Sequence, residues 1–137
     1  MKLKDQVCSL KLAKKLKKLG VKQNSYWYWQ RNVNVPSKYW QIVDKGDVFY
    51  KSKTKISAFT AAELGEVFPQ YIENPQKKES DFHFEMTKNH MGEFSATYIK
   101  LVPTDSNFVL AIESDRAFAN ALAKMLIYLL ENKLLKD

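Results

Sequence analysis

The sequence predicts an α+β fold with antiparallel sheets, and three observations support this prediction. Residues 26–51 and 82–112 are rich in aromatic and β-branched side chains, which favour β-strands. Helical patterns precede the first of these regions, separate the two, and follow the second. The turns between successive strands are short, which favours antiparallel pairing. The predicted order of elements is therefore α-βββ-α-βββ-α.

The size and composition of the chain set the limits within which it can fold. With 137 residues it has the length of one domain, so we expect residues 1–137 to fold as a single domain. The single cysteine, Cys8, excludes an internal disulfide framework. No apolar run approaches the roughly 18 residues that a membrane span needs, and lysines interrupt the N-terminal stretch where a signal peptide would be apolar. We therefore expect a cytoplasmic protein with no membrane partner.

The net charge of +7 is confined to one end of the chain. Residues 1–22 contain eight of the 22 basic residues and one of the 15 acidic residues, so the net charge of the remainder is zero. A charge excess confined in this way predicts a localised electrostatic surface rather than a uniformly basic protein.

The first helix is predicted from Ser9, a good N-cap, to Leu19, with Gly20 as the residue that ends it. Its apolar stripe consists of Cys8, Leu12, Leu16 and Leu19. The opposite face is centred on Lys11, Lys14 and Lys18, flanked by Lys15 and Lys17. Cys8, on the apolar side, is predicted to be a small core residue rather than a nucleophile.

The stretch LGVKQNSYWYWQR, residues 19–31, has two interpretations. A turn between two helices would resemble a DNA-binding helix-turn-helix. However, a second helix would point its four consecutive aromatic side chains in all directions, whereas a strand divides them two to each face. We therefore predict a strand that begins at Tyr26.

The remaining elements follow from strand patterns, turns and caps. Strands are predicted at 26–30, 39–43, 48–51, 82–86, 94–102 and 108–112. Turns or loops are predicted at 32–38, 44–47, 73–80, 88–93 and 103–107.

Two further helices are predicted. Thr60 and Glu63 match a capping box at the start of a short helix, with Leu64, Val67 and Phe68 as its apolar contacts and Pro69 as its end. Ser114 is the predicted N-cap of the last helix. Its wide apolar face consists of Phe118, Ala121, Leu122, Met125, Leu126, Ile127, Tyr128, Leu129 and Leu130.

Three stretches resemble small uncharacterised proteins encoded in phage and prophage genomes. They are VCSLKLAKKLKKLGVKQNSYWYW (7–29), SAFTAAELGEVFP (57–69) and LAKMLIYLLENKLL (122–135). The resemblance covers about a third of the chain and occurs in the same order along it. It implies a phage or prophage origin, but it brings no activity and no site residues.

Nucleic-acid binding is the leading functional hypothesis. The residues proposed to contact phosphates are Lys11, Lys14, Lys15, Lys18 and Lys22. The residues proposed to offer stacking surfaces are Tyr26, Trp27, Tyr28, Trp29, Tyr39 and Trp40, of which the three tryptophans are the main candidates. The alternative, which such patterns represent more often, is a solvated lysine face above core aromatics. Arg31 is the only arginine near these aromatics.

Metal binding, catalysis and membrane attachment have little support in the sequence. His83 and His90 are the only histidines; His83 shares a predicted strand face with Glu85, and no spacing matches a zinc site. There is no phosphate-binding glycine loop and no serine in a glycine elbow. Attachment of the first helix to a membrane surface is disfavoured because its apolar stripe is narrow and lacks aromatics. We expect no metal, no cofactor and no enzymatic activity.

Protein binding is the alternative function. The last helix is apolar nearly all round, and three tryptophans lie within residues 27–40, a residue type enriched at interface anchors. A homodimer through the last helix or an edge strand would use these features. The sequence thus predicts a small accessory protein that acts by binding, with nucleic acid as the first candidate partner and a host or phage protein as the second.

Overall fold

The computed structural model describes residues 1–31, 40–46, 55–73, 81–100 and 109–135. Its helices are the 3₁₀ helix η1 (Leu3–Asp5), α1 (Leu10–Lys18), α2 (Ala61–Gly65) and α3 (Phe118–Glu131). Its strands are β1 (Trp27–Arg31), β2 (Trp40–Asp44), β3 (Ile56–Ser57), β4 (Tyr71–Ile72), β5 (Phe82–Lys88), β6 (Phe94–Ile99) and β7 (Val109–Asp115). The strands form two antiparallel sheets, with orders β2-β1-β3 and β4-β5-β6-β7. The predicted α+β class is confirmed.

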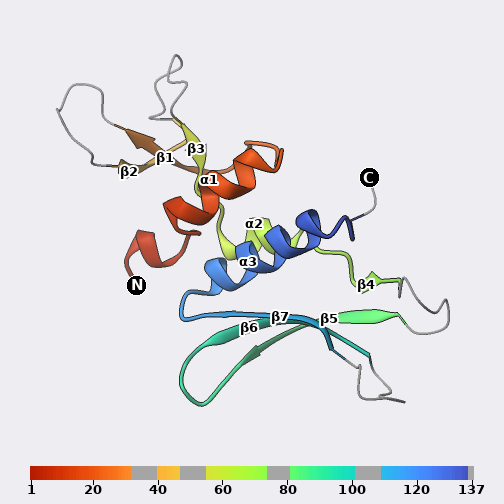
Figure 1. The fold of residues 1–137 in the computed structure, drawn as a ribbon. Coiled ribbons are helices and arrows are strands. Elements are labelled where there is room, and N and C mark those ends of the chain that lie inside the picture. Colours follow the sequence, from red (N-terminus) through yellow and green to blue (C-terminus); the bar gives the residue numbers. More distant parts are fainter. Residues whose placement is uncertain (32–39, 47–54, 74–80, 101–108, 136–137) are drawn as a thin grey trace.

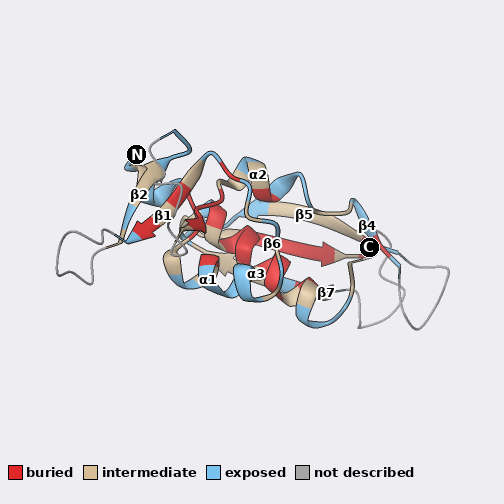
Figure 2. Cartoon of the chain, turned by 90° about the horizontal axis from the view of Figure 1, so that it is seen from above, coloured by how far each residue is buried: buried red, intermediate tan, exposed pale blue. Residues whose placement is uncertain are grey.

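The elements are arranged in layers (Figure 1). The three-stranded sheet lies against α1, α1 contacts α3, and α3 contacts α2 and covers one face of the four-stranded sheet at β6 and β7. The most deeply buried residues lie chiefly on α3 and on β6, the strand of the four-stranded sheet that α3 covers (Figure 2). The opposite face of the four-stranded sheet is not covered by any of the described helices or strands.

Helix α1 begins and ends as predicted. The Ser9 hydroxyl accepts a hydrogen bond from the Leu12 amide, which caps the N-terminus. At the other end Gly20 adopts a φ of 87°, and the amides of Gly20 and Val21 donate to the carbonyls of Lys17 and Leu16. These bonds satisfy carbonyls of the last turn, and a glycine adopts this conformation without steric cost.

The apolar stripe of α1 is centred one position away from the predicted one. Ala13 and Leu16 are buried, whereas Leu12 and Leu19 are only half-buried. Ala13 belongs to the buried core cluster, while Leu12 lies beside Ile127 and Tyr128 of α3. Cys8 is fully buried, so its predicted place in the core is confirmed.

The segment after Gly20 forms a strand, and the helix-turn-helix interpretation is excluded. β1 is the central strand of its sheet and pairs with β2 on one side and β3 on the other. Because side chains alternate along a strand, Tyr28 and Gln30 lie on one face, and Trp27, Trp29 and Arg31 on the other. Tyr39, the loop at 32–38 and the predicted strand at 48–51 lie outside the described residues.

Helix α2 begins with the predicted capping box. The Thr60 hydroxyl accepts a bond from the Glu63 amide, and the Glu63 carboxylate accepts one from the Thr60 amide. The same carboxylate accepts the Tyr26 amide and the Ser25 hydroxyl, so Glu63 also holds the chain where it enters β1. The end of α2 was predicted wrongly: the helix stops at Gly65, before Pro69, and leaves Val67 51% exposed.

The second sheet has one strand more than the sequence predicted. β4 is only two residues long, too short to show a period of its own, and it pairs with the start of β5. The predicted strand at 94–102 ends at Ile99, and the predicted turn at 103–107 and most of the predicted loop at 73–80 lie outside the described residues.

Ser114 is not the N-cap of the last helix. β7 continues to Asp115 because Ser114 and Asp115 still pair with β6, and the Ser114 hydroxyl lies 2.7 Å from that of Ser95. The N-cap is Ala117, whose side chain makes no capping bond. Asp115 instead holds the junction, since its carboxylate accepts bonds from the Ala117 amide and the Asn120 side chain.

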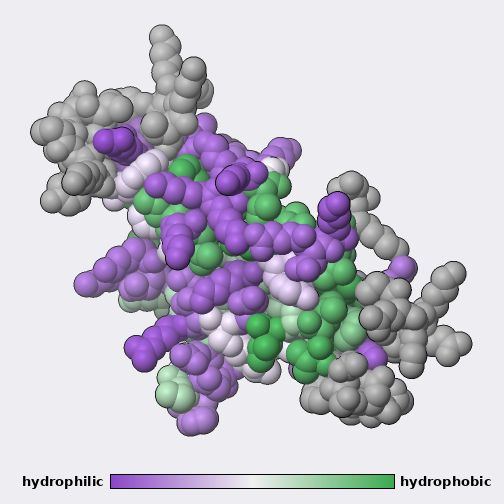
Figure 3. Space-filling view, viewed as in Figure 1, coloured by the Kyte–Doolittle hydropathy of each residue, from purple (hydrophilic) through white to green (hydrophobic). Residues whose placement is uncertain are grey.

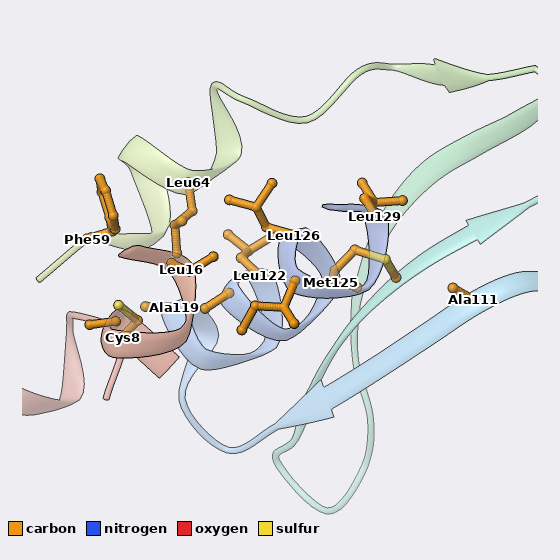
Figure 4. Packing of buried hydrophobic residues seen from close by; sticks show 14 of the residues in the cluster. Cys8, Leu16, Phe59, Leu64, Ala111, Ala119, Leu122, Met125, Leu126 and Leu129 are labelled. Atoms are coloured by element: carbon orange, nitrogen blue, oxygen red, sulfur yellow. The ribbon is translucent and has the colours of Figure 1, made fainter. Parts of the chain in front are cut away.

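Helix α3 forms the centre of the core. Eight of its fourteen residues are buried, against α1 and α2 on one side and the four-stranded sheet on the other. Leu122 and Leu126 point towards Leu16 of α1 and Leu64 of α2, while Met125 and Leu129 lie towards the sheet (Figure 4). Phe118, predicted on the apolar face, is 39% exposed.

Candidate nucleic-acid interface

The lysines of α1 divide into three groups according to the element that each one faces. Lys15 lies on the side of α3, where its ammonium is 2.7 Å from the carboxylate of Glu131. Lys17 lies on the side of the three-stranded sheet and donates to the Lys55 carbonyl at 3.1 Å. Lys14 lies on the same side, with its nitrogen 4.8 Å from the centre of the Trp40 ring. Lys15 and Lys17 are therefore engaged within the chain.

The third group faces solvent between these two sides. At 100° per residue, Lys11 and Lys18 project from α1 between Lys14 and Lys15. Both are exposed, and among the described residues neither has a hydrogen-bond or ion-pair partner. Lys22, which follows the turn at Gly20, is also exposed. Together with Lys14, which lies beside them over Trp40, these residues form a surface that we call the basic strip (Lys11, Lys14, Lys18 and Lys22). The hydrophilic surface in Figure 3 extends over α1.

The three candidate tryptophans share one face of the three-stranded sheet. Trp40 pairs with Arg31, two positions beyond Trp29 on β1, so its side chain lies on the same face as Trp27 and Trp29. This face is turned towards α1, because the Trp29 indole donates to the Cys8 carbonyl at 3.0 Å and Lys14 lies over Trp40. All three rings are half-buried.

The three tryptophans differ in how closely they pack against the hydrophobic core. Trp29 and Trp40 pack against the core cluster, and Trp29 is further fixed by its hydrogen bond. Trp27 lies outside that cluster. Trp40 therefore has one part against the core and another part beneath Lys14. Trp40 and Trp27 are the tryptophans best placed to contact a ligand.

The tyrosines have opposite environments. Tyr28 is only 3% exposed, and its hydroxyl accepts the Ser25 amide. Tyr26 is 73% exposed and lies at a bend just before β1, so the alternation of the strand does not assign it to the tryptophan face. Of the six candidate aromatics, Tyr28 is thus a core residue, and Tyr39 lies outside the described residues.

The structure places Arg31 beside Trp40, one of the candidate stacking residues. It is exposed at the end of β1, directly across from Trp40 and on the same face. An arginine beside an indole ring can bind a phosphate through two parallel hydrogen bonds. No sequence signal could reveal this proximity, because the register of β1 and β2 creates it.

The other candidate groups show no catalytic arrangement in the parts of the chain described. Burial raises the pKa of Cys8 from 9.0 to about 12, which keeps the thiol protonated and unreactive at neutral pH. His83 lies edge-on against the Tyr71 ring, 4.5 Å between centroids. No three His, Cys, Asp or Glu side chains among the described residues are placed to hold a metal ion. None of the described helices is long and apolar enough to cross a membrane.

Comparisons with known proteins give no further guide to function. The chain matches no family model, no curated protein and no solved structure.

Proposed function

We propose that this chain is a small accessory protein of phage or prophage type that binds single-stranded nucleic acid, and that it is not an enzyme. The proposed surface consists of the basic strip, the rings of Trp40 and Trp27, and Arg31. The observation that carries the proposal is the position of the Lys14 ammonium, 4.8 Å above the Trp40 ring, with Lys11 and Lys18 beside it and without partners in the described segments.

Cations and aromatic rings have complementary tasks on such a surface. Lysines neutralise phosphates and release counterions, while a base stacks on an exposed ring whatever its sequence. Within the described residues, the one interaction that holds Lys14 over Trp40 is a cation–π contact at the surface, which is worth about 0.5–1 kcal/mol. A base that stacks on Trp40 can therefore displace Lys14 towards a phosphate at little cost. Single strands are favoured over duplex because their bases are free to stack.

The salt dependence of binding follows from the number of lysines. If three or four residues of the basic strip contact phosphates, the logarithm of the association constant should fall with a slope of about −2 to −3 against the logarithm of salt concentration. Tryptophan fluorescence reports binding directly, because Trp40 and Trp27 lie on the proposed surface.

The test is a titration with single-stranded oligothymidine, duplex DNA and single-stranded RNA at low and at physiological salt. We expect salt-sensitive quenching by single strands that Lys14→Glu with Lys18→Glu abolishes. The matched control is Lys2→Glu with Lys4→Glu, two exposed lysines outside the basic strip that carry the same change in charge. A flat response of the folded protein at low salt, or equal losses in both double variants, would contradict the proposal.

A protein partner is the second candidate function, and one observation favours it. On the uncovered face of the four-stranded sheet, Tyr71, Val109 and Ile112 are 49%, 41% and 60% exposed. Hydrophobic residues also gather near the start of β7 in Figure 3. By contrast, the apolar face of α3 and two of the three tryptophans, Trp29 and Trp40, contact the chain's own core. These were features that suggested a protein partner in the sequence.

Sedimentation equilibrium at several concentrations tests for self-association through this face. A concentration-dependent mass that Ile112→Lys reduces to that of the monomer would support a homodimer. A mass equal to that of the monomer at all concentrations would contradict self-association through this face.

A further inference from the structure

A pocket of about 590 Å³ opens where four segments far apart in the sequence meet. They are the N-terminal segment with η1, the start of α2, the start of β6 and the start of α3. The N-terminus and the start of α3 lie on the same side of the molecule (left in Figure 1). None of the lining residues belongs to the basic strip or to the tryptophan face.

The walls of the pocket suit a flat apolar group. Phe94 and Phe118 stack with their ring centres 5.1 Å apart and form one wall. Ala61 and Ala62 of α2 line another part, where their small side chains leave space. Phe118 is 39% exposed although it begins the most apolar helix of the chain, so its ring is available at the pocket. Pockets of this volume with mainly apolar linings are typical of small-molecule sites.

The pocket lining contains one cationic and one acidic side chain, Arg116 and Asp5. The guanidinium of Arg116 lines it, and Arg116 is exposed and has no hydrogen-bond or ion-pair partner in the described part of the chain. Lys88, which is not part of the lining, has its ammonium 5.2 Å from the centre of the Phe94 ring. Asp5 is the one acidic residue of the lining. An unpartnered arginine beside an aromatic wall selects a negatively charged group, above all a carboxylate that it can bind through two hydrogen bonds.

We propose that this pocket binds a small molecule composed of a flat apolar body and one carboxylate. The flat body lies against Phe94 and Phe118, and the carboxylate pairs with Arg116 at the mouth. This site is separate from the nucleic-acid surface proposed above, so either can fail without the other.

The experiment compares two probes of the same shape, naphthalene-2-carboxylate and naphthalene-2-carboxamide. The amide lacks the negative charge and has an amino group in place of one acceptor oxygen. Binding is measured by isothermal titration and by amide chemical shifts of the full chain. We expect the carboxylate to bind about tenfold more tightly than the amide, the size of one partly exposed charge-assisted hydrogen-bonded pair. Shifts should centre on Phe94, Arg116 and Phe118.

Two variants with matched controls locate the site. Arg116→Gln should reduce carboxylate affinity to that of the amide, whereas Lys45→Gln, an equal loss of charge at a distant exposed turn, should leave it unchanged. Ala62→Trp, at an exposed position of the lining, should block both probes, whereas Val67→Trp outside the pocket should block neither.

Three outcomes would overturn the proposal. The first is equal affinity for both probes, which removes the role of Arg116. The second is unchanged binding in a folded Ala62→Trp variant, which places the probes elsewhere. The third is the absence of binding to the folded wild-type chain at millimolar probe concentration, which would show that the pocket does not bind a molecule of this kind.

Discussion

The two ends of the molecule use aromatic and aliphatic residues in opposite ways. In the C-terminal region, α3 and the face of the four-stranded sheet that it covers bury aliphatic side chains and Tyr98 almost completely. In the N-terminal region, α1 and the three-stranded sheet leave three tryptophans half-buried under a lysine-rich helix. Figure 2 shows the same contrast, since α3 and β6 are mostly buried whereas α1 is exposed along one side. The first region therefore buries most of its apolar side chains on the face that α3 covers, whereas the second leaves large rings partly accessible to solvent.

The largest effect should come from truncating the core. Leu122 is 1% exposed and lies between α1, α2 and the sheet, so Leu122→Ala should lower the free energy of unfolding by about 3–5 kcal/mol in urea denaturation. The same change at the half-buried Leu12 of α1 should cost about half as much. Equal losses would show that α1 belongs to the core as fully as α3 does, and would remove the contrast between the regions.

The rate at which the Cys8 thiol is alkylated reports how tightly the N-terminal region around α1 is held against the core. A rise in pKa from 9.0 to about 12 lowers the thiolate fraction at pH 8 by roughly a thousandfold. Alkylation by iodoacetamide, followed by mass spectrometry, should therefore be slow in the native protein and fast in urea. Rapid labelling without urea would show that the N-terminal region opens separately from α3.

Asp115 links β7 to α3 and should make stability depend on pH. Burial raises its pKa, but bonds from Lys124, the Ala117 amide and Asn120 outweigh this and hold the pKa below its ordinary value. Because the pKa is lowered on folding, the stabilisation is present above the unfolded value of about 3.9 and is lost as the pH falls through the folded value.

The corresponding variant is Asp115→Asn. It should cost about 1–2 kcal/mol at pH 7, because the charge-assisted bonds weaken, and less as the pH falls from about 5 to 2. Urea denaturation at several pH values measures both effects. A cost that does not change with pH would show that the charge of Asp115 contributes nothing.

The smallest effect should come from the ion pair that joins the two regions at the surface. Lys15 and Glu131 lie 2.7 Å apart, but their side chains are 49% and 46% exposed. Lys15→Gln should therefore change the free energy of unfolding by less than about 0.5 kcal/mol. A loss of 2 kcal/mol or more would mean that this contact, rather than apolar packing, holds α1 on α3.

Local signals in the sequence predicted much of the fold because their causes are local. The Ser9 cap, the Gly20 turn and the Thr60–Glu63 capping box depend on residues within one helical turn, and the structure contains all three. The strand predicted at 82–86 likewise lies within β5. The errors lay where long-range pairing decides the outcome: β4 exists only because β5 lies beside it, and Ser114 stays in β7 because β6 still pairs with it.

The sequence by itself determined the α+β class, the strand after Gly20, the buried Cys8 and the basic face of α1, since composition and periodicity are properties of the chain alone. Only the tertiary structure decided which lysines are engaged by Glu131 and Lys55, and which one lies over Trp40. It also created the pocket at Arg116 from segments that begin more than a hundred residues apart. The physical reason is that surfaces and pockets form where distant segments meet, and no local pattern records that meeting.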